Sequence, residues 1–197
     1  MRTSPVHVIV TVIALGLSAL ACNIALPSAP SAPIPTFVAS PKDASDMEQS
    51  FRNAVNQAST TGNFNVSITQ QQISSYLALN GAALAAQEGY QWPFKSVEVA
   101  LNGGKITVWG VIAQQGIPDT PSQVVFTPSI DGAGQLTVTV DSGQIGIVGV
   151  PSSILADVTK SIRSLLTGQL AQIQGHYKLT ALTINNGAMT VGGQVTN

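Results

Sequence analysis

The stretch from Leu136 to Ile173 constrains the fold most, because its apolar period changes from that of a strand to that of a helix. Leu136–Val140 alternates apolar and polar residues, which predicts a strand with one apolar face. A glycine-rich passage follows over Gly143–Pro151, and a long amphipathic helix is predicted over roughly Ser152–Gln174. The apolar residues that share one face of this helix are Ile154, Leu155, Val158, Ile162, Leu165, Leu166, Leu170 and Ile173.

At ~100° per residue this apolar face spreads over roughly 160°, wider than the ~100° stripe that suffices for packing on a sheet. We therefore expect the helix and the sheet before it to form the working surface. Gly143, Gly146 and Gly149 do not have the spacing of a phosphate-binding loop, and the residues between them are largely apolar. The passage is interpreted as a bend at a strand end.

Residues 1–21 have the pattern of an export signal. Arg2 and the terminal amine precede an uncharged apolar run, Val8–Leu20, that is short for a membrane span of ~20 residues. Leu17–Cys22 resembles the lipobox of bacterial lipoproteins, which implies that Cys22 is lipidated and becomes the mature N-terminus. Ala19-Leu20-Ala21 also fits ordinary signal peptidase, which would leave a secreted free thiol. The lipid anchor is favoured because a Pro/Ala/Ser-rich tether, residues 22–44, follows directly.

The folded domain is predicted over residues 45–197. Ser45 and Glu48 have capping-box spacing for a short helix that ends before Gly62, and Thr69 and Gln72 form a similar cap for a second helix reaching about Glu88. Residues 64–68 alternate as a brief strand between these helices. Asn80 and Gly81 are expected to bend the second helix, and Gly89 to end it.

From Phe94 the period is two, and a four-strand meander is predicted up to Ile147. Its first turn is Asn102-Gly103-Gly104, a hairpin signal. After the long helix a final hairpin turns at Asn185-Asn186-Gly187, with a bulge expected near Ala181. This order of elements predicts an α+β fold with a mostly antiparallel sheet and at least one helix across one face.

Residues that carry catalytic chemistry are sparse. Charged residues make up 9% of the chain, the formal net charge is -1, and Cys22 is the single cysteine. This charge is not basic enough for nucleic acid, no cofactor is expected, and no metal-ligand cluster is visible. After export His176 is the only histidine, and an exposed or capping role is expected for it. Trp92, Phe94 and Trp109 are interpreted mainly as core, with a pocket mouth or membrane interface as the alternative.

From about Asn65 to Val195 the pattern resembles a short bacterial branch of the tubular lipid-binding (TULIP-like) superfamily. The residues that carry the resemblance are the capped helix after a strand at 67–77, the hairpin at 97–108, the strand-to-helix passage at 145–151 and the closing strands at 179–191. The resemblance implies a curved sheet wrapped on a long amphipathic helix, with an apolar groove for an acyl chain and no catalytic activity.

The leading hypothesis is a lipid-anchored, extracytoplasmic, non-catalytic protein that holds a lipid or other amphiphile. Its groove walls are expected to be Ile154, Val158, Ile162, Leu165, Leu166 and Leu170, with Ile73, Leu77 and Leu84 from the earlier helix. The alternative for these side chains is an ordinary packed core. A structural lipoprotein whose sheet binds an envelope protein is the second hypothesis, and an enzyme assembled from scattered carboxylates is the third.

Overall fold

The computed structural model describes residues 37–87, 89, 92, 94–112, 119–146, 148–149, 156, 159–160 and 176–196. All of them lie within one compact unit, Ser31–Asn197. The elements are α2 (Pro41–Thr61), β1 (Asn63–Thr69), α3 (Gln70–Gln87), β2 (Phe94–Asn102), β3 (Lys105–Ile112), β4 (Thr120–Ile130), β5 (Leu136–Ile145), β6 (Val148–Gly149), β7 (His176–Asn185) and β8 (Ala188–Thr196).

Helix α2 begins before the predicted domain start at Ser45. The hydroxyl of Ser40 accepts a hydrogen bond from the backbone N–H of Asp43 at 3.1 Å, and Pro41 opens the helix. The predicted capping box of Ser45 and Glu48 is therefore wrong, because proline at the first helical position supplies the right φ and has no N–H to satisfy. Glu48 instead lies 3.5 Å from Arg52, one turn on. The predicted end is confirmed, since Gly62 caps the helix with φ +73°.

Helix α3 follows the sequence prediction closely. The N–H of Thr69 donates to Gln72 Oε1 at 2.9 Å, and the N–H of Gln72 donates back to Thr69 Oγ1 at 3.2 Å, which confirms the capping box. The helix is continuous through Gly81. A Cβ on Gly81 would lie 2.6 Å from the indole ring of Trp92, so this glycine allows the close approach of an aromatic ring.

The strands form two antiparallel sheets, where the sequence predicted a single mostly antiparallel sheet. One has three strands in the order β1-β8-β7, and the other is the meander β2-β3-β4-β5-β6. The predicted bulge is confirmed by a register shift between Leu179 and Ala181. The predicted turns are confirmed too, since Gly103, Gly104, Asn186 and Gly187 all have positive φ.

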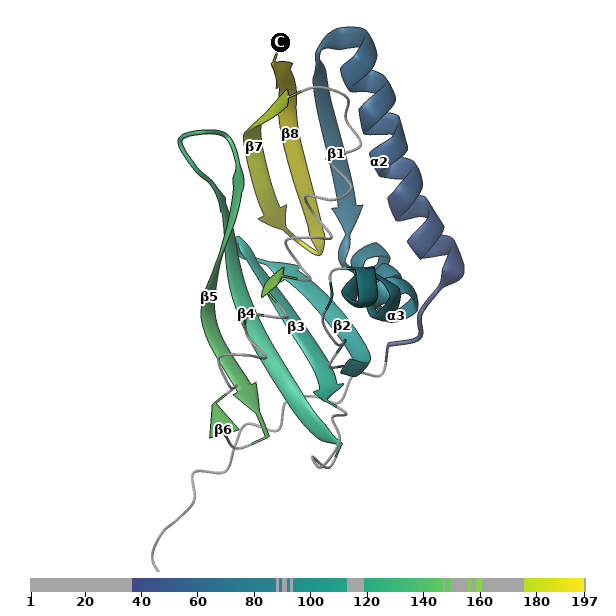
Figure 1. Ribbon diagram of the computed structural model, residues 1–197, viewed down its shortest axis with the longest axis vertical. Helices are drawn as coiled ribbons and strands as arrows, with labels where there is room; N and C mark the ends of the chain where they lie inside the picture. Colours follow the sequence, from purple (N-terminus) through teal and green to yellow (C-terminus); the bar gives the residue numbers. More distant parts are fainter. Residues whose placement is uncertain are drawn as a thin grey trace, which may run out of the picture. The chain divides into compact units, whose positions relative to one another are not determined.

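The two sheets meet at one end of the meander (Figure 1), and backbone hydrogen bonds between strand ends and turns join them there. Around the β7–β8 turn, the N–H of Gly187 donates to the Leu101 carbonyl at 2.9 Å, and the N–H of Gly104 donates to the Ile184 carbonyl at 3.1 Å. A further hydrogen bond at 2.8 Å joins the Leu179 N–H of β7 to the Gly134 carbonyl of the β4–β5 turn. These bonds hold one end of the meander against the three-stranded sheet.

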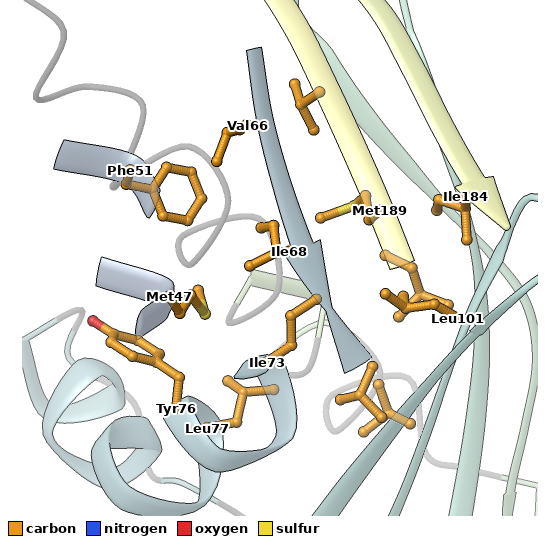
Figure 2. Packing of buried hydrophobic residues seen from close by; sticks show 14 of the residues in the cluster. Met47, Phe51, Val66, Ile68, Ile73, Tyr76, Leu77, Leu101, Ile184 and Met189 are labelled. Atoms are coloured by element: carbon orange, nitrogen blue, oxygen red, sulfur yellow. The ribbon is translucent and has the colours of Figure 1, made fainter. Parts of the chain in front are cut away.

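The core is one cluster of side chains from both helices and both sheets. Helix α2 packs on β1, and α3 packs on α2 and on β2. Figure 2 shows how Met47 and Phe51 of α2 approach Ile68 of β1 and Ile73 and Leu77 of α3. Burial of apolar area is the main force that stabilises such a fold, and it contributes roughly 25 cal/mol per Å².

The arrangement of a sheet around a long helix is not shown. Of the predicted helix 152–174 the structure describes Ala156, Thr159 and Lys160, which are helical. The apolar face that the sequence assigned to this helix lies outside the described residues. The α+β class and the antiparallel strands are thus established, while the wrapped helix stays a prediction.

Candidate ligand-binding surface

Burial of the five-stranded sheet decreases from β2 to β5 across its inner face, the face that contributes to the core. The inward side chains of β2, β3 and most of β4 are buried, with Val99 at 2%, Val108 at 2% and Phe126 at 0% exposure. The inward side chains of β5 are only half-buried, although they continue the same rows. One flank of the sheet is therefore closed by the core, and the other flank is partly open.

Side chains of α3 cover the outer edge of β2 and form hydrogen bonds with its backbone. The hydroxyl of Ser74, 1% exposed, accepts a hydrogen bond from the Val99 N–H at 2.8 Å and lies 3.3 Å from the Val99 carbonyl. The Leu101 N–H donates to Gln70 Oε1 at 3.3 Å. A helix thus supplies the partners that a neighbouring strand would give, because an unpaired edge is costly when buried.

The β5 flank instead carries a group of half-buried apolar side chains, which we call the apolar margin. These residues border the core without being enclosed by it. The β4–β5 turn meets β7 through the hydrogen bond between Gly134 and Leu179, which brings the two sheets together at this margin. The apolar margin consists of Ile130, Leu136, Val138, Val140, Ile145, Tyr177 and Leu182.

Tyr177 is the polar member of the apolar margin. Its ring meets Phe64 edge to face, with centroids 6.4 Å apart, and Phe64 lies directly over Gly193 of the neighbouring strand. Partial burial raises the pKa of the Tyr177 phenol above its usual value, because ionisation would place a charge next to apolar side chains. The margin thus has an aromatic ring that keeps its proton.

Some of the candidate residues named from the sequence lie in the core, and the others lie outside the residues that the structure describes. Ile73 and Leu77 lie in the core at 4% and 2% exposure, and Leu84 is half-buried against it. Ile154, Val158, Ile162, Leu165, Leu166, Leu170 and the lipidation candidate Cys22 lie outside the described residues. Within the described chain, the packed-core alternative therefore holds for Ile73 and Leu77.

The glycine-rich passage after β5 is a turn. Gly146 has φ +55°, and its N–H donates to the Pro121 carbonyl at 2.8 Å. Val148 and Gly149 then pair back onto Ile145 and Gln144. The interpretation of the passage as a bend is confirmed at Gly146, where a left-handed backbone favours glycine.

Several charged side chains of the described residues form exposed ion pairs. Lys105 donates to Asp141 Oδ2 at 2.8 Å, and the Thr127 hydroxyl donates to the same oxygen at 2.7 Å. These two hydrogen bonds lower the pKa of Asp141. His176 opens β7 opposite Thr196. No group of three or more potential metal-ligating side chains occurs within the described residues.

Comparison with known proteins gives no family for this chain. A scan against protein-family models finds no match, and searches of curated proteins and of solved structures find none either. None of the helices in the described part of the chain is both long and apolar enough to cross a membrane.

Two features of this surface were not found by sequence reasoning. The role of Ser74 has no sequence signal, because the local sequence around a helical serine does not show whether its hydroxyl binds the backbone of a distant strand. The strand containing Leu136, Val138 and Val140 was predicted, but its incomplete burial was not. Alternation gives the face on which a side chain lies and does not give what covers that face.

Proposed function

We propose that the protein is a lipid-anchored, extracytoplasmic module that binds a lipid or another amphiphile without catalysing a reaction. The observation that supports ligand binding is the apolar margin, where Leu136, Val138 and Val140 present a continuous half-buried row on β5. Contiguous apolar surface that is left partly open is typical of binding sites for apolar groups. The anchor rests on the lipobox-like Leu17–Cys22 and the tether that follows it.

In this proposal an acyl chain lies along the inner side of β5, between that strand and β7. Each buried methylene group of the chain would contribute about 0.8 kcal/mol. The predicted helix 152–174, with its wide apolar face, would form the opposite wall. Tyr177, which keeps its phenolic proton at neutral pH, would lie beside the chain as a neutral hydrogen-bonding group.

Adjacent residues of β5 provide a matched test of the groove. The side chain of Val138 faces the core side, whereas Thr139 is exposed on the opposite face. The full chain is extracted in mild detergent and examined by native mass spectrometry and by titration with a fluorescent fatty acid. We expect Val138→Glu to abolish binding of the fatty acid, because a carboxylate would enter the apolar row, and Thr139→Glu to leave it intact.

Circular dichroism must show that both variants are folded. Absence of a co-purifying lipid together with absence of fatty-acid binding in the unsubstituted chain would refute ligand binding. The anchor is tested separately by Cys22→Ser, which should release the protein from membranes. Unchanged membrane retention in that variant would refute the anchor and leave the ligand question open to the first test.

A second candidate function is docking of an envelope protein on the sheet. Within the described residues, β5 pairs with β6 only at Gln144 and Ile145, so Leu136–Gly143 has a strand partner on one side alone. Such an edge can accept an extended segment from another protein. Val140→Pro removes an N–H that faces the open edge, because alternation along the β4–β5 ladder turns the N–H of Thr139 towards β4. This variant should then abolish stoichiometric capture of one partner protein while fatty-acid binding is absent throughout.

A further inference from the structure

The outer face of the five-stranded sheet has one row of side chains that crosses four strands. Strand pairing places Glu98 opposite Trp109, Trp109 opposite Gln123, and Gln123 opposite Gln144. All four residues alternate with inward residues that belong to or border the core, so they lie on the face away from it. At about 4.8 Å between strands the row spans roughly 14 Å.

These four side chains have unused binding capacity. Among the described residues none of them makes a hydrogen bond, an ion pair or a ring contact. The row therefore offers a carboxylate acceptor, an indole donor and two amides that each donate and accept. A ligand that meets this row must be rich in groups that can both donate and accept hydrogen bonds.

The other end of the same face is different, because several of its polar groups are paired with one another. Lys105 and Thr127 both bind Asp141, at 2.8 and 2.7 Å. The hydroxyls of Ser129 and Thr137 lie 2.7 Å apart. These polar groups are thus paired within the protein, whereas those of the row with Trp109 have their hydrogen-bonding groups available to a ligand.

Trp109 is the aromatic residue of this face. Phe94 and Phe126 point into the core at 7% and 0% exposure, and Trp92 packs edge to face on Phe94 with centroids 5.3 Å apart. Trp109 lies instead on the outer face, with half-buried Val111 on its own strand and Val125 on β4 beside it. An indole with an apolar body and a polar tip suits a ligand that has an apolar face and polar edges.

We propose that the row Glu98–Trp109–Gln123–Gln144 is a binding site for carbohydrate, specifically an uncharged, flat, β-linked glycan chain lying across the strands. The C–H face of a pyranose ring stacks on Trp109, while its hydroxyl groups bind the carboxylate and the two amides. The single charge of the row is the carboxylate of Glu98, so acidic glycans are repelled. This site is on the opposite face of the sheet from the apolar margin and is independent of amphiphile binding.

The test uses the full chain in a zwitterionic detergent that has no sugar headgroup. Cellohexaose and chitohexaose are titrated by calorimetry, and tryptophan fluorescence is followed in parallel. The chain contains two tryptophans, so Trp92→Phe leaves Trp109 as the only reporter. We expect a fluorescence change on binding in that variant and at least about a tenfold loss of affinity in Trp109→Thr, which keeps a strand-forming residue.

Gln123→Ala and Gln144→Ala should each weaken binding severalfold. Gln194→Ala, an exposed glutamine on β8 of the other sheet, is the matched control and should not change binding. Thermal unfolding shows which variants are folded. The proposal is overturned if neither hexasaccharide binds at millimolar concentration, or if Trp109→Thr binds as well as the unsubstituted chain. It is also overturned if light scattering shows a dimer that Trp109→Thr dissociates while no sugar binds, because the row would then be a self-association surface.

Discussion

Strands β2 and β5, on the two flanks of the five-stranded sheet, both place apolar side chains on the inner face, but these side chains lie in different environments. On the β2 flank, α3 covers the inward side chains and supplies Ser74 and Gln70 to the strand edge. On the β5 flank, the inward side chains of Leu136, Val138 and Val140 are only half-buried. The closed flank therefore contributes more buried apolar area to stability, and the half-buried flank is the one to which we assign the ligand in the proposed function.

The largest expected effect comes from removing the same side chain on the two flanks. Leu101 on β2 is 1% exposed, and Leu136 on β5 is half-buried. We expect Leu101→Ala to lower the free energy of unfolding by about 2–5 kcal/mol, because it leaves a cavity in a packed core. Leu136→Ala should cost less than about 1.5 kcal/mol, since less area was buried there. Equal losses in urea unfolding would remove the distinction between the flanks.

A second prediction concerns the edge of β2, where α3 side chains bind the backbone. Ser74→Ala removes the acceptor of the Val99 N–H in a buried setting, since the Ser74 hydroxyl donates its own proton to the Gln70 carbonyl at 2.7 Å. We expect a loss of roughly 1–3 kcal/mol, the cost of unsatisfied buried polar groups. Ser142→Ala, at an exposed position on β5, is the control and should change stability by less than about 0.5 kcal/mol. Comparable urea midpoints for the two variants would show that the hydrogen bond between Ser74 and Val99 does not contribute to stability.

The third prediction separates packing from helix propensity. Alanine in place of Gly81 favours the helix by about 0.5–1 kcal/mol, yet its Cβ would lie 2.6 Å from the Trp92 indole. We expect Gly81→Ala to destabilise by about 1 kcal/mol net, because overpacking costs about 1–3 kcal/mol. Gly132→Ala in the β4–β5 turn meets no atom within 4 Å and should be close to neutral. A gain in melting temperature for Gly81→Ala would contradict the close approach of Trp92.

The smallest expected effect is the pH dependence of the half-buried flank. The pKa of Tyr177 is higher in the folded protein than in the unfolded chain, so the folded state holds its proton to higher pH. The contribution of Tyr177 to stability should therefore be constant below about pH 10, the pKa of an unperturbed tyrosine, and fall as pH rises from there towards the folded pKa. Tyr177→Phe should reduce this alkaline loss in urea titrations. An unchanged loss would show that other groups cause it.

Local signals determined much of the secondary structure from the sequence alone. The capping box at Thr69, the turns at Gly103 and Asn186, and the bulge next to Ala181 depend on a few neighbouring residues, and all were predicted. The start of α2 was missed because the alternative cap, Ser45 with Glu48, has the same spacing rule. Pro41 at the first helical position decides between these two local signals in favour of Ser40 as the cap.

The candidate surface depended on contacts that no local pattern contains. Pairing of β1 with β8 joins strands from opposite ends of the domain, and this pairing turns the predicted single sheet into two. Ser74 meets Val99 across 25 positions of sequence. The sequence by itself determined which side chains share a face, because strand and helix periods are fixed by backbone geometry. Only the tertiary structure decided which faces are covered, because burial depends on segments that are distant in the chain.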